Sequence, residues 1–272
     1  MTLSPKGFGL SIERGVALIT LDRPDRLNSL TFDIYEELAA TFVSLETDEV
    51  RSVVITGQGR GFCSGGDVEG IIAELFERDA AGLLAFTRTT GRLIRNILEL
   101  RRPVIAAVNG VAVGAGAVIA AACDIRIAAD TARFGYIFPK VGLCGADMGA
   151  AYLLPQIVGR GRAAELLYFG DIIDAPTALG MGLVNRVVPT EQCLAVAKEW
   201  ALRLSEGPAF AHAMTKQMIQ GEIGMSVPEA IEAEAQAQAI CMAHPDFRTA
   251  YDANKAKARP RFAGAPSEDE TA

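Results

Sequence analysis

Two short β-rich runs in this chain are each followed by a glycine-bearing loop and then by a helix-like stretch. The runs are Ser52–Gly57 and Pro103–Val108, and the loops are Gly61–Asp67 and Asn109–Gly116, about fifty residues apart. Compact β-branched runs are typical of buried strands, and strands that alternate with helices favour an α/β architecture. Glycine lets backbone approach a ligand closely, and a helix start has free N–H groups. The two loops are therefore either plain tight turns or a joint binding site for one anionic oxygen.

The rest of the chain divides into a mixed first part and a helical second part. Apolar runs at Leu10–Glu13 and Val16–Leu21 predict an opening hairpin, and apolar residues at helical spacing predict a helix over Thr31–Leu45. Strand signals vanish from Thr190 onward. Four helices are predicted there, separated by proline and glycine, at Cys193–Leu204, Pro208–Gln220, Pro228–Met242 and Phe247–Lys257.

Composition limits the classes of function. Half of the 272 residues are hydrophobic, which is enough for a substantial core. The start at Met1–Gly9 is weakly patterned and predicted to fray, and the small, acidic segment Ala263–Ala272 is predicted to be a disordered tail. The net charge is −7 and the pI is about 5.0, and no clustered basic face is visible in the sequence. These features argue against nucleic-acid binding, which requires neutralisation of phosphates.

The cysteines and the N-terminus indicate a cytoplasmic protein. The five cysteines are widely spaced and lack a CxxC pair, so neither a disulfide framework nor a metal site is predicted. No basic segment leads into an apolar stretch at the start, so no signal peptide is expected. The uncharged stretch Pro103–Cys123 is long enough to suggest a membrane span, but Asn109, Gly114 and Gly116 interrupt it. It is better interpreted as a buried strand, a turn and a tightly packed helix.

Several further blocks carry a resemblance to a known family. The blocks are Arg23–Pro24, Leu27–Leu30, Gly61–Asp67, Ala107–Gly116, Cys123–Ile125, Phe134–Gly135, Pro155–Gly159 and Ala175–Pro189. In order and spacing they are similar to the crotonase family, the enoyl-CoA hydratase/isomerase superfamily, over roughly Ile12–Phe262. The resemblance implies an α/β fold: a crotonase-like superhelix of repeated ββα units over residues 1–189, which holds the oxyanion hole and the acyl-CoA site. It also implies a C-terminal helical trimerisation region over residues 190–262, in a homotrimer or a hexamer.

The same resemblance implies chemistry on an acyl-CoA thioester, with coenzyme A as part of the substrate and no prosthetic group. Removing a proton from the acyl chain, or adding a nucleophile to it, places negative charge on the thioester carbonyl oxygen. By the match to the family motif, the backbone N–H groups of Gly66 and Ala115 stabilise that charge. The family usually has alanine at the first position and glycine at the second. Both exchanges keep a backbone N–H, so we expect the oxyanion hole to persist.

The carboxylates decide which reaction follows. Hydratases of this family use two glutamates, and the matching positions here are Val118 and Phe138, neither of which transfers a proton. Asp147 matches, by its distance to Val158–Gly159, an aspartate of several relatives. That aspartate moves protons in dienoyl-CoA isomerases and in the ring-epoxide isomerases of phenylacetate breakdown, and it is the nucleophile in chlorobenzoyl-CoA dehalogenases. Asp147 is predicted to act as acid and base, or alternatively only to cap a helix that begins at Met148.

Double-bond isomerisation of an enoyl-CoA is the favoured reaction, because one base beside an oxyanion hole can move a proton between two carbons. A true enoyl-CoA hydratase, a lyase, is the alternative if Asp147 alone handles water or Glu69 takes part. A non-catalytic relative that binds acyl-CoA or RNA is a third. The dehalogenase relatives use an active-site histidine in the first half of the chain. Dehalogenation is therefore disfavoured, because both histidines here, His212 and His244, lie late in the chain. Hydrolase activity, the pathway, and the length and aromatic character of the acyl group stay open.

Coenzyme-binding residues are also implied by the resemblance. Those expected to line the adenine and pantetheine path are Arg26, Leu27, Ser64, Gly65, Asp67 and Val68. Lys257 is expected to reach coenzyme phosphates, across a subunit boundary if the chain forms a trimer. Asp67 is alternatively a loop-fixing side chain, and Cys63 is expected to be an inert thiol because no neighbouring base is evident. The stretch Ile71–Thr90 either lines the acyl end or is a plain amphipathic helix.

Overall fold

The chain opens with the predicted hairpin. The computed structural model describes residues 6–266, apart from the side chain of Val68. Strands β1 (Phe8–Glu13) and β2 (Val16–Leu21) pair in antiparallel fashion. Phe8 is buried within β1, so the prediction of a frayed start is wrong for residues 8 and 9. Residues 1–5 of that start, and residues 267–272 of the predicted tail, lie outside the described residues.

The strands divide between two sheets. The larger sheet has the order β1, β2, β3 (Ser52–Gly57), β5 (Val104–Val108), β7 (Ile125–Ala129) and β10 (Arg186–Val188), parallel from β2 onward. The smaller sheet has the order β4 (Gly61–Cys63), β6 (Val111–Val113), β8 (Arg133–Gly135) and β9 (Ile173–Asp174). Consecutive strands β3 and β4, β5 and β6, and β7 and β8 thus alternate between the sheets before each following helix. This alternation confirms the predicted repetition of ββα units.

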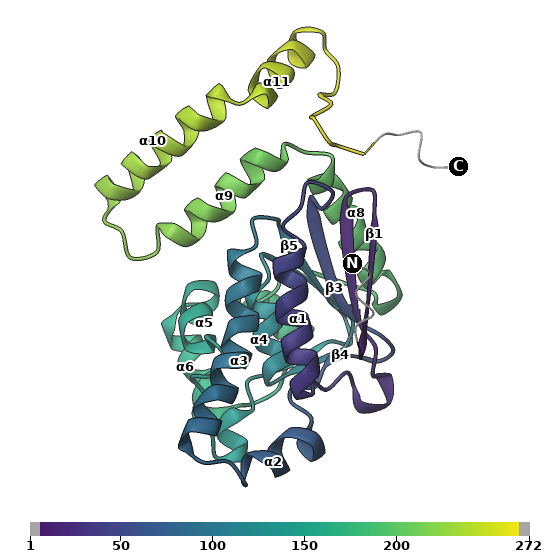
Figure 1. The fold of residues 1–272 in the computed structure, drawn as a ribbon, viewed down its shortest axis with the longest axis vertical. Coiled ribbons are helices and arrows are strands. Elements are labelled where there is room, and N and C mark those ends of the chain that lie inside the picture. Colours follow the sequence, from purple (N-terminus) through teal and green to yellow (C-terminus); the bar gives the residue numbers. More distant parts are fainter. Residues whose placement is uncertain (1–5, 267–272) are drawn as a thin grey trace.

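Eleven helices surround the sheets in the described part of the chain. They are α1 (Phe32–Ser44), α2 (Ala73–Leu75), α3 (Ala80–Glu99), α4 (Ala115–Ala122), α5 (Ala150–Val158), α6 (Arg160–Phe169), α7 (Ala175–Gly180), α8 (Cys193–Ser205), α9 (Ala209–Gly221), α10 (Val227–Ala243) and α11 (Pro245–Lys255). Helices α1 and α3 pack side by side, and α8 packs on β3 and β5 of the larger sheet. Helices α9, α10 and α11 extend away from this body (Figure 1). The four helices predicted after Thr190 are confirmed.

Two buried cations connect the C-terminal part of the chain to the rest of the molecule. The Lys216 ammonium on α9 donates to the carbonyls of Ile97 and Arg102, both at 3.1 Å, and pairs with Asp124 at 2.9 Å. The guanidinium of Arg51, which precedes β3, donates to the carbonyl of Ala263 at 2.9 Å. The first residue of the segment predicted to be a disordered tail therefore has a fixed partner.

Helix α4 is the centre of the core. All eight of its residues are buried, and its N-terminal turn lies against β4. A β-carbon added to Gly116 would lie 2.1 Å from the carbonyl oxygen of Cys63, so only glycine allows this approach. The helix belongs to the stretch Pro103–Cys123, which the sequence predicted to be buried in a globular core. Among the described residues, no helix has the length and apolarity needed to cross a membrane.

Substitution of Gly116 by alanine is expected to destabilise the fold. The new methyl group would overlap backbone, which cannot rotate away, and overpacking of this kind costs about 1–3 kcal/mol or more in the free energy of unfolding. Gly91→Ala in α3 is the matched control, because an added β-carbon there meets nothing within 4 Å. That control is expected to raise stability by about 0.5–1 kcal/mol. Denaturant unfolding of both variants measures the difference, and equal stability would contradict the predicted overlap.

Candidate active site

The two glycine loops meet where β4 and β6 end. Gly65 has a φ of +93° and Gly114 a φ of +53°, a region that suits glycine. A β-carbon added to Gly65 would lie 3.1 Å from the carbonyl oxygen of Val113 and 3.4 Å from the backbone nitrogen of Ala115. The first loop therefore passes directly beside the start of α4, as a joint site requires.

Gly66 and Ala115 both present a backbone N–H at this junction. Leu30 donates to the Gly65 carbonyl and accepts from the Asp67 N–H, each at 2.8 Å. In such a parallel bridge the N–H of the central residue, Gly66, points away from Leu30. Ala115 is the first residue of α4, so its N–H has no acceptor within the helix. With the positive end of the helix dipole, the two groups can stabilise an oxyanion.

Asp147 lies in the loop that leads into α5. Its Oδ1 accepts the N–H of Met148 at 2.9 Å, and its other oxygen has no donor among the described residues. Helix α5 begins at Ala150 with Gly149 as its N-cap, so the alternative that Asp147 caps a helix from Met148 is wrong. Met148 has a φ of +51°, a strained conformation for a residue with a side chain. Such strain clusters at functional sites.

Burial raises the pKa of the Asp147 carboxyl above its ordinary value, and the Met148 N–H opposes this to a smaller extent. If the carboxylate form is the base, kcat/KM must rise as pH increases through this raised pKa. The ordinary pKa of an aspartate is about 4. We therefore expect the acidic limb of the pH profile to lie at a higher pH than this value. Initial rates across the acidic range measure it. An acidic limb at the ordinary aspartate pKa would contradict the assignment of Asp147.

The positions that the resemblance assigns to the two glutamates hold buried apolar side chains. Val118 is fully buried in α4, and Phe138 is 8% exposed at the start of a short 3-10 turn. Neither side chain can hold or ionise a water molecule. The two family glutamate positions therefore supply no carboxylate to this chain.

The predicted coenzyme-binding residues of the two N-terminal segments lie together. The Ser64 N–H donates to the Leu27 carbonyl at 2.9 Å, and the Ser64 hydroxyl donates to the Arg26 carbonyl at 3.2 Å. The Arg26 guanidinium pairs with Glu69 at 3.0 Å, and both side chains are largely exposed. The segments around Arg26 and Ser64 therefore form one exposed rim beside Gly65. Val68 begins the π-helical turn Val68–Ile72, but its side chain lies outside the described residues.

Asp67 fixes the loop that carries Gly66. Its carboxylate accepts from the Gly70 N–H at 2.9 Å, from the Arg23 guanidinium at 2.9 Å and from the Ser29 hydroxyl at 3.1 Å. The Gly70 N–H, more than Arg23 and Ser29, lowers the pKa of Asp67. Its role in loop fixing was predicted as the alternative, and every bond that the structure gives its carboxylate supports that role.

Two other residues were singled out in the sequence, Lys257 and Cys63. Lys257 follows α11, and α11 lies at the opposite end of the molecule from α2, which follows the Gly66 loop (Figure 1). The chain therefore does not itself bring Lys257 to the other coenzyme-binding residues. Cys63 is fully buried, and burial raises the pKa of its thiol to about 12. This thiol is protonated at neutral pH, as expected for an inert cysteine.

Sequence reasoning missed one polar group of the active site, the Tyr35 hydroxyl on α1. Tyr35 is 2% exposed, and its oxygen would lie 3.9 Å from a β-carbon added to Gly66. Burial raises the pKa of Tyr35 well above its ordinary value, and the nearby groups Cys63 and Asp147 add to that shift. The available signal was a hydroxyl-bearing ring on the otherwise apolar face of the predicted helix Thr31–Leu45.

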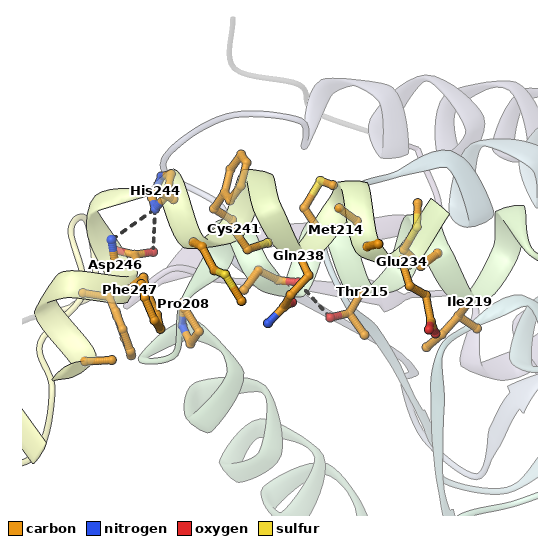
Figure 2. A pocket seen from close by; sticks show the side chains of 18 of the residues that line it. Pro208, Met214, Thr215, Ile219, Glu234, Gln238, Cys241, His244, Asp246 and Phe247 are labelled. Atoms are coloured by element: carbon orange, nitrogen blue, oxygen red, sulfur yellow. Dashed lines mark hydrogen bonds and ion pairs between the residues drawn. The ribbon is translucent and has the colours of Figure 1, made fainter. Parts of the chain in front are cut away.

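A hollow lies between α9, α10 and α11 (Figure 2). These helices extend away from the part of the molecule that carries β4 and α4 (Figure 1). The hollow is a groove of about 670 Å³ with a mainly apolar lining that includes Phe210, Met214, Ile231 and Phe247. Ile219 and Met242 of this lining are exposed, and so is Ile240 of α10. Within the described residues, the groove holds no group of His, Cys, Asp or Glu suited to a metal ion.

Comparison with known proteins agrees with this geometry. The family model for "Enoyl-CoA hydratase/isomerase" matches residues 11–265. The chain belongs to the enoyl-CoA hydratase/isomerase family. It is therefore an enzyme of that family, with an acyl-CoA thioester as the implied type of substrate.

The relatives carry the names of two reactions. The 1,2-epoxyphenylacetyl-CoA isomerase of Escherichia coli (strain K12) is 35% identical over 254 residues, 93% of this chain and 97% of that protein. The short-chain-enoyl-CoA hydratase of Clostridium acetobutylicum is 36% identical over 247 residues, 90% of this chain and 92% of that protein. A solved structure from Streptomyces coelicolor A3(2), provisionally named an enoyl-CoA hydratase, is 43% identical. Its TM-score is 0.93, and the match covers 97% of this chain and 98% of that one.

Proposed function

We propose that this enzyme isomerises the double bond of an enoyl-CoA through a thioester enolate, with Asp147 as both acid and base. The observation that carries the proposal is the combination of one partly buried carboxylate of raised pKa with apolar side chains at both family glutamate positions. Hydration needs a polarised water and two proton transfers, whereas isomerisation needs one group that takes and returns a proton.

The reaction begins with a 3-enoyl-CoA in the site. The Asp147 carboxylate takes a proton from the carbon next to the thioester, and the electron pair of that C–H bond moves into the new enolate. Negative charge develops on the thioester oxygen, where the N–H groups of Gly66 and Ala115 stabilise it. The Asp147 carboxyl then returns the proton at the far end of the conjugated system, and the product is a 2-enoyl-CoA. Protons and electrons balance without a co-reactant.

We also infer how the coenzyme part is bound. The Arg26–Leu27 backbone and the Ser64–Asp67 loop form the rim of the site, which supports their role along the adenine and pantetheine path. Val68 extends this loop. Lys257 reaches the phosphates from a neighbouring subunit, because its own chain carries it at the other end of the molecule from α2. Phe86, on α3, contacts Tyr35 and Phe32, which supports placing the acyl end against the stretch Ile71–Thr90.

A second copy of the chain is the partner proposed for the C-terminal helices. The groove between α9, α10 and α11 has a mainly apolar lining, and apolar side chains of these helices are exposed. Contiguous exposed apolar surface marks interaction sites. Packing of this region on a neighbour would cover these side chains and would form a trimer or hexamer. We expect light scattering on the purified protein to give three or six times the chain mass of 28.8 kDa. A monomer at micromolar concentration would contradict this assembly.

A hydratase is the second candidate function, because relatives of the same identity carry that name. Mass spectrometry of 2-enoyl-, 3-enoyl- and aryl-CoA esters after incubation in D2O separates the candidates. Deuterium uptake without addition supports isomerisation. Gain of a whole water supports hydration, release of a free acid means hydrolysis, and unchanged masses for all esters favour a non-catalytic acyl-CoA-binding protein. The Asp147→Asn variant is the control.

A further inference from the structure

Tyr35 presents a hydroxyl group that nothing in the chain uses. No described residue forms a hydrogen bond with its oxygen, although the whole side chain is 2% exposed. The other deeply buried tyrosine, Tyr136, donates to the carbonyl of Ala117 at 3.4 Å. Buried hydroxyl groups without a partner are uncommon, since each costs the desolvation of a polar group. A ligand or water is therefore needed to complete the bonding of Tyr35.

The phenolic oxygen adjoins open space. The unpaired side-chain atoms that are sealed from solvent in the described residues belong to Arg14, Arg102, His212 and Glu222, and Tyr35 is not among them. Since the rest of the ring is buried, its oxygen is the part left accessible. Its distance of 3.9 Å from the β-carbon position of Gly66 places that opening beside the oxyanion loop.

Aromatic packing holds the Tyr35 ring in place. The Phe86 ring of α3 meets it edge to face at a centroid distance of 6.1 Å, and Phe32 meets Phe86 at 5.2 Å. Phe32 and Tyr35 are three residues apart on α1, so both rings lie on the side that faces α3. This packing fixes the position of the ring and therefore of its phenolic oxygen. The position of this donor is thus preorganised, as in a binding site.

The electrostatic surroundings indicate which part of a substrate lies next to Tyr35. The groups that interact with its hydroxyl are Cys63, a protonated thiol, and Asp147, the proposed base. Tyr35 and Asp147 share no hydrogen bond in the described part of the chain, so the hydroxyl, 3.9 Å from the β-carbon position of Gly66, is free to donate to a bound substrate. The thioester oxygen already has two donors in the N–H groups of Gly66 and Ala115. An oxygen on the acyl chain is the substrate acceptor that is left for the Tyr35 hydroxyl.

We propose that the Tyr35 hydroxyl donates a hydrogen bond to an oxygen atom carried by the acyl chain, so that the substrate is an oxygen-substituted acyl-CoA. The inference rests on the proposed acyl-CoA site and specifies its substrate class. A purely hydrocarbon chain would fill the space with apolar atoms and leave the hydroxyl unpaired, which disfavours binding. A hydroxyl, keto or epoxide oxygen pairs with it. Tyr35 is neutral at physiological pH and can therefore donate.

A binding comparison tests this pairing without depending on turnover. The probes are 3-hexenoyl-CoA and its 5-hydroxy derivative, and Kd is measured by calorimetry for the Asp147→Asn protein with and without Tyr35→Phe. We expect Tyr35→Phe to weaken binding of the hydroxy ester by about 10- to 100-fold and to leave the plain ester unchanged or slightly tighter. Tyr136→Phe removes a buried hydroxyl that has its own partner, and should leave the ratio of the two Kd values unchanged.

Other outcomes would overturn the inference. Equal weakening for both esters would mean that Tyr35 serves the shared thioester part or the Asp147 loop, and no weakening for either would mean that it contacts no substrate. Thermal unfolding of Tyr35→Phe should be unchanged or higher, since the variant keeps the ring and removes an unpaired polar atom. Turnover of the two esters by the wild-type protein tests the proposed isomerisation separately. Failure there leaves the binding result interpretable.

Discussion

Replacement of Asp147 by asparagine is expected to reduce kcat by about 10²- to 10⁴-fold, the usual contribution of a general base. In the wild-type protein the Met148 N–H donates to Asp147 Oδ1 at 2.9 Å. Asparagine has the same shape and keeps an Oδ1 that can accept this N–H. It cannot take a proton. Steady-state kinetics on the best ester found in the D2O experiment measure the loss. Because the thioester and coenzyme contacts persist, Kd for that ester should change little.

Glu69→Gln is the matched control for this variant. Glu69 lies in the π-helical turn that follows the Gly66 loop, pairs with Arg26 at 3.0 Å, and has a side chain that is 76% exposed. It is the other acid considered in the sequence for handling water. Its replacement should leave kcat within about threefold, because exposed ion pairs contribute little energy. A large loss in Glu69→Gln with normal activity in Asp147→Asn would reverse the assignment of the base.

Stability offers an independent check on Asp147. Since its folded pKa is raised, the carboxyl stabilises the fold fully only below its unfolded pKa, and this contribution is lost as pH rises through the folded pKa. Asparagine does not ionise. The variant should therefore gain stability relative to the wild-type protein as pH increases from acid to neutral. A variant that is less stable at neutral pH would indicate a structural role for the carboxylate.

The long elements were predictable because each carries its own local signal. Helix α4 lies within the stretch Pro103–Cys123, where a tightly packed helix was predicted, since glycine marks its start and its residues are mostly small and all apolar. Strand β5 matched its β-branched run in the same way. Strand β2 has the predicted bounds Val16–Leu21, and β1 begins two residues before the predicted Leu10. The spacing of apolar residues, with glycine or proline at the ends, was sufficient to predict an element that is long or has clearly marked ends.

The smaller sheet was not predictable from local pattern. Residues 61–67 and 109–116 were interpreted as loops, yet Gly61–Cys63 is β4 and Val111–Val113 is β6. Three residues are too few to show alternation of apolar and polar side chains. These strands form because β4 pairs with β6, and β6 with β8, contacts between segments far apart in sequence. The interpretation of both segments as loops is wrong for their strand residues.

The proposed site residues differ in how far the sequence could indicate them. Gly66, Ala115 and Asp147 come from motifs with fixed neighbours, so they could be proposed from the sequence and stay predictions. Tyr35 carries no motif. The surroundings of its hydroxyl come from tertiary packing, because Phe86 of α3 and the Gly66 loop both lie next to Tyr35 of α1 only in the folded chain. Local patterns identify groups that a loop presents, whereas groups presented by helix packing require the structure.

Removing the Ala115 N–H by an Ala115→Pro substitution is expected to lower kcat by about 10²- to 10³-fold, the usual effect of losing one oxyanion-hole donor. Ala115 is the first residue of α4, where proline is tolerated because its missing N–H has no partner in the helix. Gly114, with φ +53° and ψ −124°, has no side chain to clash with the proline ring. Circular dichroism should therefore report an intact fold.

The form of the loss distinguishes the oxyanion hole from a general disturbance. Charge on the thioester oxygen is greatest in the enolate, so the N–H stabilises the transition state more than the bound ester. Ala115→Pro should lower kcat more than it raises Kd for the unreacted ester, and deuterium exchange beside the thioester should slow together with turnover. Ala115→Gly keeps the N–H and should retain most activity. If exchange persisted at the wild-type rate in Ala115→Pro, the charge would be stabilised elsewhere, and the assignment of both loop donors would have to be withdrawn.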